Sequence, residues 1–452
     1  MSFHQYPDSH VFYRRLTRQF PLIVRGEGCW LYAEDGTPYL DGSGGAFVAN
    51  IGHGVAEIGQ AMADQAARVA YLNGTAFTSE PVEQLAEEFS RLLPGDLDKI
   101  YFLSSGSEAV EAALKLARQY WVEVGRPSKH TIIALTPSYH GNTLLALSAS
   151  ARETYKVYFR EWLVNVHRIP AAYAYRCECG GDPRAACPVC DGSGLEHAIE
   201  LLGADNVAAF IAEPVGGSST GHTVPRPDYF KRVREICDRH QVLFIADEVL
   251  SGAGRTGTWT AIEQYGVVPD IMTLGKGITG GYAPLSLVAA PERLLDPIAH
   301  GSGALLHNQT FSHHPVLAAA GLAVERYMRR NRLVERCAAM GPVFHQKLQA
   351  LRQLPHVGDV RGRGLLAGVE FVQDTETRAP FPRRLKFAET FDEEAVRAGL
   401  RIWPNSAQAD GINGDLACLA PPFIIEEWEM DELVQRFARA LECTVDRLAV
   451  RT

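Results

Sequence analysis

The fold class follows first from the stretch Val242-Leu243-Phe244-Ile245-Ala246-Asp247-Glu248-Val249. It is an apolar run of strand length that ends in two carboxylates. Such a run is typical of a strand that helices cover on both faces, as in a parallel sheet. Four more short apolar or β-branched runs have the length of a strand. Stretches with the spacing of apolar residues typical of a helix, such as Glu108 to Trp121, lie between them. The five predicted strands are Ile100 to Leu103, Thr131 to Leu135, Val207 to Ala212, Val242 to Ala246 and Ile271 to Leu274. This alternation predicts an α/β fold with a mostly parallel sheet.

The length of 452 residues is too great for one simple core, so two closely packed domains are expected. Gly28 to Asp41 has the pattern of a hairpin with Asp35-Gly36 at its turn. Leu365 to Phe371 has the pattern of a strand, and an amphipathic helix is predicted from Glu427 onward. We expect these two chain ends to form one small α+β domain. The predicted parts are residues 1–65 in the small domain, 66–328 in the large domain, and 329–452 in the small domain again.

The composition is that of a soluble globular enzyme, with 46% hydrophobic and 21% charged residues. A net charge of -9 without a basic cluster argues against nucleic acid as a partner. The first residues lack the pattern of a secretion signal, and no uncharged apolar run approaches the roughly 18 residues of a membrane-spanning helix. We therefore expect a cytoplasmic protein without a membrane partner, whose nine cysteines stay reduced.

The segment Ser104-Ser105-Gly106-Ser107-Glu108-Ala109 lies where a predicted strand ends and a helix begins. The first backbone N–H groups of a helix have no partner inside the helix, and they suit a phosphate dianion. Serine and glycine are also common as plain N-caps, so this segment alone does not separate a phosphate site from a simple helix start.

Asp247 and Lys276 each follow a predicted strand, at the edge where open α/β sheets place their ligands. A carboxylate there could pair with a protonated pyridine nitrogen and keep that ring an electron sink. Lysine forms Schiff bases with carbonyl cofactors, and the glycines on either side of Lys276 allow a bulky group to approach. Tyr139 follows another strand and could stack on a planar ring. Viewed separately, each residue could also be an ordinary surface or core side chain, which is what most lysines and tyrosines are.

The order of these segments resembles that of the class III aminotransferases, which are pyridoxal 5'-phosphate (PLP) enzymes of fold type I. The resemblance spans nearly the whole chain. It rests on Tyr39-Leu40-Asp41-Gly42, Gly52-His53-Gly54, Ser105-Gly106-Ser107-Glu108-Ala109, Tyr139-His140-Gly141, Glu213-Pro214, Asp247-Glu248-Val249, Gly254-Arg255-Thr256-Gly257, Gly275-Lys276-Gly277, Thr310-Phe311-Ser312, His314-Pro315, Arg363-Gly364-Leu365 and Ala420-Pro421-Pro422.

The resemblance implies two catalytic residues: Lys276 holds PLP as a Schiff base and later moves a proton, and Asp247 pairs with the ring nitrogen. It also implies further cofactor contacts. These are Ser105, Gly106 and Ser107 at the phosphate, Tyr139 and Val249 on the two ring faces, His140 beside Tyr139, Glu213 near Asp247, and Thr310 reaching the phosphate of the neighbouring subunit.

The same resemblance implies a large domain with a seven-stranded sheet, a small α+β domain, and an active homodimer, or a tetramer built from it. The implied reaction moves an amino group from an amine or ω-amino acid to a 2-oxo acid, such as pyruvate or 2-oxoglutarate, with ping-pong kinetics. We place the substrate pocket at Phe47, Arg401 and Trp403. Phe47 stands where many ω-amine transaminases have tryptophan, and Arg401 could bind a carboxylate or point to solvent.

Four cysteines cluster in an insertion of about residues 173–196, as Cys177-Glu178-Cys179 and Cys187-Pro188-Val189-Cys190. Four thiolates with this spacing could hold one tetrahedral zinc ion. Free thiols on an exposed insertion are the alternative.

Two other functions stay open at this point. A class III racemase or aminomutase would share every cofactor residue and would return the nitrogen to the same carbon skeleton. A zinc-dependent interaction protein on an inactive aminotransferase scaffold would have no need of Lys276 and Asp247.

Overall fold

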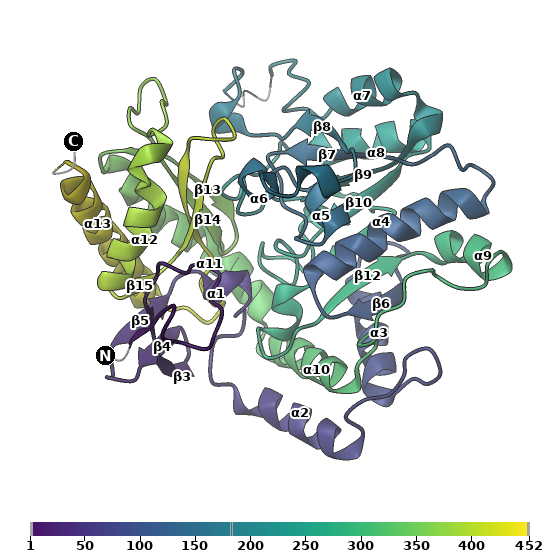
Figure 1. Ribbon diagram of the computed structural model, residues 1–452, viewed down its shortest axis with the longest axis horizontal. Helices are drawn as coiled ribbons and strands as arrows, with labels where there is room; N and C mark the ends of the chain where they lie inside the picture. The colour runs from purple at the N-terminus through teal and green to yellow at the C-terminus, as the bar shows by residue number, and fades with distance from the viewer. Residues whose placement is uncertain (1–2, 181, 183, 450–452) are drawn as a thin grey trace.

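The computed structural model describes residues 3–180, 182 and 184–449, and its centre is a seven-stranded sheet (Figure 1). In spatial order the strands are β6 (Lys99–Leu103), β12 (Ser286–Ala290), β11 (Ile271–Leu274), β10 (Leu243–Asp247), β9 (Val207–Ala212), β7 (Thr131–Thr136) and β8 (His167–Pro170). β12 is antiparallel to both neighbours, and the other pairs are parallel. The predicted α/β fold with a mostly parallel sheet is confirmed, as are all five predicted strands.

Helices cover both faces of this sheet. Successive side chains of a strand point to opposite faces, so neighbouring residues of one strand pack against different helices. Phe210 and Phe244 belong to one buried cluster, whereas Ile211 and Ile245 belong to another. The first cluster includes side chains of α3 (Glu80–Leu92), α7 (Gly194–Leu202), α8 (Tyr229–His240) and α10 (Pro315–Arg330). The second includes side chains of α4 (Gly106–Glu123), α5 (Leu144–Ala149) and α9 (Glu292–His300). The predicted helix from Glu108 to Trp121 lies within α4.

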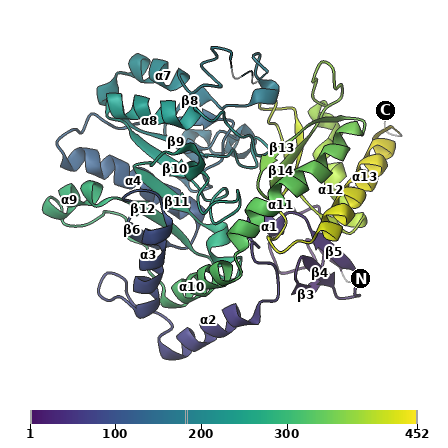
Figure 2. The same ribbon diagram turned by 180° about the vertical axis from the view of Figure 1, so that it is seen from behind.

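The two chain ends combine beside the central sheet, at the left of Figure 1 and the right of Figure 2. The predicted hairpin is present as β4 (Trp30–Ala33) and β5 (Pro38–Asp41), and β3 (Ile23–Glu27) extends it. On its other side, β5 pairs in parallel with β15 (Leu400–Arg401). A second four-stranded sheet consists of β13 (Val357–Arg363), β14 (Leu366–Phe371), β17 (Asp415–Leu419) and β16 (Trp403–Ser406).

The remaining elements connect or cover these sheets. They are β1 (Phe3–His4), β2 (Phe20–Pro21), α1 (Gly44–Phe47), α2 (Ala56–Arg68), α6 (Glu153–Lys156), α11 (Leu333–Leu348), α12 (Phe387–Arg397) and α13 (Glu427–Ala449). The expected boundaries at 65/66 and 328/329 fall inside α2 and α10, which pack against each other, so the division into domains stays a prediction. Within the described residues, no helix has both the length and the apolar character needed to span a membrane.

Candidate active site

Loops from several strands meet at one edge of the central sheet. β6, β7, β10 and β11 run in the same direction, so their carboxyl ends lie together. A Cβ atom built on Gly106, the first residue of α4, would lie 2.6 Å from Val249 Cγ1. A Cβ atom built on Gly275 would lie 3.4 Å from the same atom. The start of α4, the loop after β10 and the loop of Lys276 therefore meet around Val249.

Asp247 is the last residue of β10, and its buried carboxylate has three hydrogen-bond partners. Asp247 Oδ2 lies 2.7 Å from His140 Nδ1. Asp247 Oδ1 accepts hydrogen bonds from Thr273 Oγ1 at 3.2 Å and from Val249 N at 3.1 Å. The structure thus places His140 against Asp247, where its imidazole fixes the direction of the carboxylate.

Lys276 begins a short 3-10 turn, Lys276–Thr279, immediately after β11 and Gly275. Its φ of 47° is a left-handed conformation, which is uncommon for a residue with a side chain and worth attention in a binding site. Burial lowers the pKa of the Lys276 amine, while the negative charges of Asp247 and Glu213 act in the opposite direction. A lowered pKa increases the fraction of neutral amine, which is the form that attacks a carbonyl carbon.

Glu213 lies behind the same loops and is a buried acid. Burial raises the pKa of Glu213 to about 7, and the nearby charge of Asp247 adds to that rise. Its Oε2 accepts a hydrogen bond from Tyr139 N at 3.3 Å. Glu213 therefore positions the backbone of the loop that carries Tyr139 and His140. Burial also raises the pKa of the Tyr139 phenol, so this ring stays neutral at physiological pH.

The two serines at the start of α4 have different surroundings. Ser105 is the N-cap, and its Oγ accepts from Glu108 N at 3.3 Å and donates to Glu108 Oε2 at 3.0 Å. Ser107 Oγ donates to Asn142 Oδ1 at 2.9 Å and accepts from Asn142 N at 3.1 Å. The hydroxyl of Ser105 thus caps the helix, and Ser107 joins α4 to the loop after β7. Their roles at a phosphate stay predictions.

Thr310 lies on an exposed loop, and its carbonyl accepts a hydrogen bond from the Tyr71 hydroxyl at 3.1 Å. The preceding residue, Gln309, donates to Ser104 Oγ and to Glu108 Oε1, both at 2.9 Å. The loop is therefore anchored to the start of α4, with Thr310 at its surface. A contact of Thr310 with a second subunit stays a prediction.

Two of the three predicted substrate residues line a cavity of about 490 Å³. Trp403 and Arg401 line the cavity, and the Trp403 ring contacts the Phe47 ring at 5.5 Å between centroids. The Phe47 ring in turn lies 5.9 Å from Lys276 Nζ. Arg401 forms an ion pair with Asp392, a carboxylate that Arg18 also contacts at 2.5 Å. Arg401 is therefore already paired with a carboxylate of this chain, and its side chain is 29% exposed, so its role toward a substrate stays a prediction.

Sequence reasoning missed most of the wall of this cavity. Six arginines line it against two carboxylates, Glu389 and Asp392. These arginines are Arg14, Arg15, Arg18, Arg152, Arg383 and Arg401. Arg152 stacks on Tyr155 at 4.2 Å, and the Tyr155 ring meets Tyr139 edge-on at 6.1 Å. Arg14, Arg15 and Arg18 lie close together in the sequence, but their position beside Arg152, Arg383 and Arg401 depends on contacts between distant segments.

The assembled groups fit PLP. The first backbone N–H groups of α4 could hold a phosphate, and Asp247 offers a fixed carboxylate for a protonated ring nitrogen. Lys276 is half-buried among the same loops, and its amine has a lowered pKa. No group in this set conflicts with the cofactor that the motifs imply.

Comparisons with known proteins agree with this geometry. The family model of the class-III aminotransferases matches residues 12–441. The uncharacterized aminotransferase YodT of Bacillus subtilis is 38% identical, over 96% of this chain and 97% of its own. The putrescine–pyruvate aminotransferase of Pseudomonas aeruginosa is 32% identical, over 94% and 91%. An (S)-enantioselective omega-transaminase structure from Thermomicrobium roseum aligns with a TM-score of 0.89 and 34% identity, over 97% of each chain. The chain therefore belongs to the class III aminotransferases, the PLP enzymes of fold type I that its motifs resemble.

Proposed function

We propose that this aminotransferase moves an amino group from an amine or ω-amino acid to pyruvate or 2-oxoglutarate, by a ping-pong mechanism. The observation that carries the proposal is the half-buried Lys276, whose amine has a lowered pKa and shares one site with the fixed carboxylate of Asp247. PLP, when bound, supplies an electron sink for the carbon that loses a proton. The remaining chemistry belongs to residues of the chain.

Lys276 Nζ would hold the cofactor and would be released when a substrate amine takes its place. The released amine would then remove the proton from the substrate carbon that bears the nitrogen. Asp247 would keep the ring nitrogen protonated, and His140 and Thr273 keep its carboxylate in place. The α4 terminus would hold the phosphate, while Tyr139 and Val249 would enclose the ring.

The arginine-lined cavity supports substrates with a carboxylate at the far end. It adjoins the site through Trp403 and Phe47, and its arginines outnumber its carboxylates. Arginine pairs with carboxylates through two parallel hydrogen bonds. We propose that Arg152 contributes to binding the distal carboxylate of 2-oxoglutarate.

The test is a panel of ¹⁵N-labelled amines and ω-amino acids, each incubated with pyruvate or 2-oxoglutarate. We expect labelled alanine or glutamate by mass spectrometry, and none with the Lys276→Ala enzyme. Label that stays on the donor skeleton, with inverted configuration or at a new carbon, would instead indicate a racemase or aminomutase. A folded protein that binds no PLP would indicate an interaction protein.

The proposal includes a cytoplasmic homodimer in which Thr310 completes the phosphate site of the other subunit. All nine cysteines are free in the structure, as in a reducing compartment. Subunits carrying Thr310→Ala and Lys276→Ala can be mixed after mild dissociation. We expect the mixture to gain activity, because each heterodimer has one site with both native residues. Activity that follows simple dilution would place Thr310 outside the neighbouring site.

A further inference from the structure

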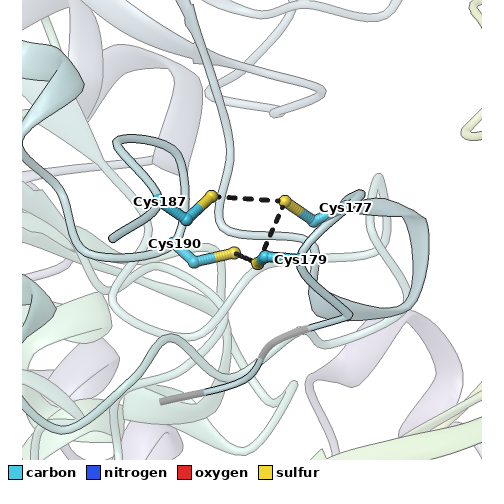
Figure 3. A group of neighbouring side chains, drawn as sticks. All are labelled: Cys177, Cys179, Cys187 and Cys190. Atoms are coloured by element: carbon cyan, nitrogen blue, oxygen red, sulfur yellow. Dashed lines mark hydrogen bonds between the residues drawn. The ribbon is translucent and has the colours of Figure 1, made fainter. Parts of the chain in front are cut away.

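We propose that Cys177, Cys179, Cys187 and Cys190 bind one structural zinc ion. The four cysteines lie in the segment from Cys177 to Cys190, named here the cysteine loop, which connects β8 to α7 (Figure 3). Their Sγ atoms all lie within 4.8 Å of one another. The shorter separations are 3.5 Å for Cys177–Cys187, 3.4 Å for Cys177–Cys179 and 3.3 Å for Cys179–Cys190.

These separations suit a single tetrahedral ion. Four sulfurs at about 2.3 Å from zinc lie roughly 3.8 Å apart, which is inside the observed range. A disulfide needs sulfurs about 2.05 Å apart, and all four cysteines are free. Zinc is the metal that closed sets of four thiolates most often hold in structural sites.

Two short turns bring the sulfurs together. In the first, Gly180 N donates to Cys177 O at 2.9 Å, and Gly180 has a φ of 61° that favours glycine. In the second, Cys190 N donates to Cys187 O at 3.0 Å, and Asp191 N donates to the same carbonyl at 2.9 Å. Each turn presents two sulfurs to the same point, as a pair of metal-binding knuckles does.

The described residues of the cysteine loop bury few side chains. Every described residue from Cys177 to Val189 is exposed or half-buried, and Cys190 is the first buried one. A loop of this length without an apolar core loses much conformational entropy on folding. Zinc binding would offset that cost, because the free energy of metal binding becomes free energy of folding.

The zinc would also stabilise a contact between the central sheet and the four-stranded sheet that contains β14. Tyr173 OH, just before the loop, donates to Glu370 Oε2 of β14 at 2.6 Å. Arg176 Nε donates to Glu370 Oε1 at 2.7 Å, one residue before the first cysteine. Because Glu370 is fully buried, these hydrogen bonds fix the start of the loop against the sheet that contains β14. The four sulfurs would keep the rest of the loop in register with this anchor.

A direct role in catalysis does not fit the location. The loop leaves the outermost strand, β8, and two strands, β7 and β9, separate β8 from β10. At about 4.8 Å per strand, β8 lies roughly 14 Å from the strand that carries Asp247. Loss of the metal should therefore loosen the structure more than it slows the reaction.

The decisive measurement is metal analysis of the holoenzyme purified without a polyhistidine tag. We expect about one zinc per subunit. The double variant Cys187→Ser/Cys190→Ser should lose it, whereas Cys443→Ser, which removes an exposed cysteine of α13, should keep it. Wild-type protein with no metal and four thiols open to alkylation would overturn the proposal, and so would one iron per subunit in place of zinc.

The role of the ion has a separate readout. In the zinc-free double variant we expect a lower Tm and faster hydrogen exchange at residues 173–176, with kcat within about twofold of the wild type. If the double variant fails to fold, thiol titration releases the zinc of the wild-type enzyme, a colour indicator follows the release, and Tm before and after the release measures the effect on stability. Unchanged Tm and exchange on zinc loss would overturn the stabilising role.

Discussion

The active site and the cysteine loop are both made of loops at the ends of strands, but different interactions order them. Around Asp247 and Lys276, the loops are short, lie over a buried sheet, and bring polar groups together within a close-packed core. The cysteine loop follows an edge strand, and few of its described side chains are buried. Packing against a large core can hold the loop of Lys276 in one conformation without a metal. A loop with few buried side chains needs cross-links, such as bonds to a metal ion, to hold one conformation.

The largest effect is expected from Lys276→Ala, which removes the reactive amine of the active site and leaves the cysteine loop unchanged. We expect kcat to fall on the order of 10⁴-fold or more, because the cofactor anchor and the proton carrier are lost together. Thermal unfolding and zinc content should stay unchanged. Steady-state kinetics measure the loss, with the exposed Lys231→Ala in α8 as the control. Near wild-type turnover would disprove the assignment of Lys276.

Asp247→Asn should retain the cofactor but lower kcat about 100-fold, because a neutral amide cannot keep a ring nitrogen protonated. The fold should survive, since asparagine keeps one oxygen for the hydrogen bonds from Thr273 and Val249. Absorbance spectra check cofactor retention, and single-turnover rates check the chemistry. A rate close to that of the wild type would mean that another acid acts on the ring.

Arg152→Gln addresses the cavity wall and should raise KM for 2-oxoglutarate about tenfold, with little change for pyruvate. The matched control is Arg383→Gln, because Arg383 is already paired with Glu389. Initial rates over a range of each acceptor separate KM from kcat. Equal changes for both acceptors would show that Arg152 supports the fold of the cavity rather than the recognition of a second carboxylate.

The smallest effect is expected from Glu213→Gln on the pH dependence of stability. Because the pKa of Glu213 is raised to about 7, the folded protein binds an extra proton between the unfolded value near 4.5 and that pH. Its contribution to stability is therefore complete below about pH 4.5 and is lost as pH rises through 7. Glutamine should flatten this decline by up to about 1.4 kcal/mol per pH unit. Denaturant unfolding from pH 5 to 8 measures the difference, and parallel curves for both proteins would contradict it.

The sequence predicted the parts of the molecule that local patterns encode. Buried strands have long apolar runs, so β9 and β11 were placed correctly to the residue, and β10 within one residue. β8 was missed, because its sequence His167-Arg168-Ile169-Pro170 has no apolar run, and β12 was missed as well. The motifs placed Lys276 and Asp247 at the same sheet edge. The hydrogen bond between His140 and Asp247 and the five cavity arginines other than Arg401 were not predicted, since both depend on contacts between distant segments.

The parallel pairing of β5 with β15 has a consequence for how the enzyme is made in the cell. Leu40 and Arg401 emerge from the ribosome at opposite ends of synthesis, yet they belong to one sheet, and Arg401 lines the cavity beside the active site. The central sheet, whose strands lie between residues 99 and 290, can begin to form on the nascent chain before that pairing exists. The cavity wall that includes Arg401 cannot form until translation has passed residue 401, so a stalled or truncated chain would have the central sheet without this cavity.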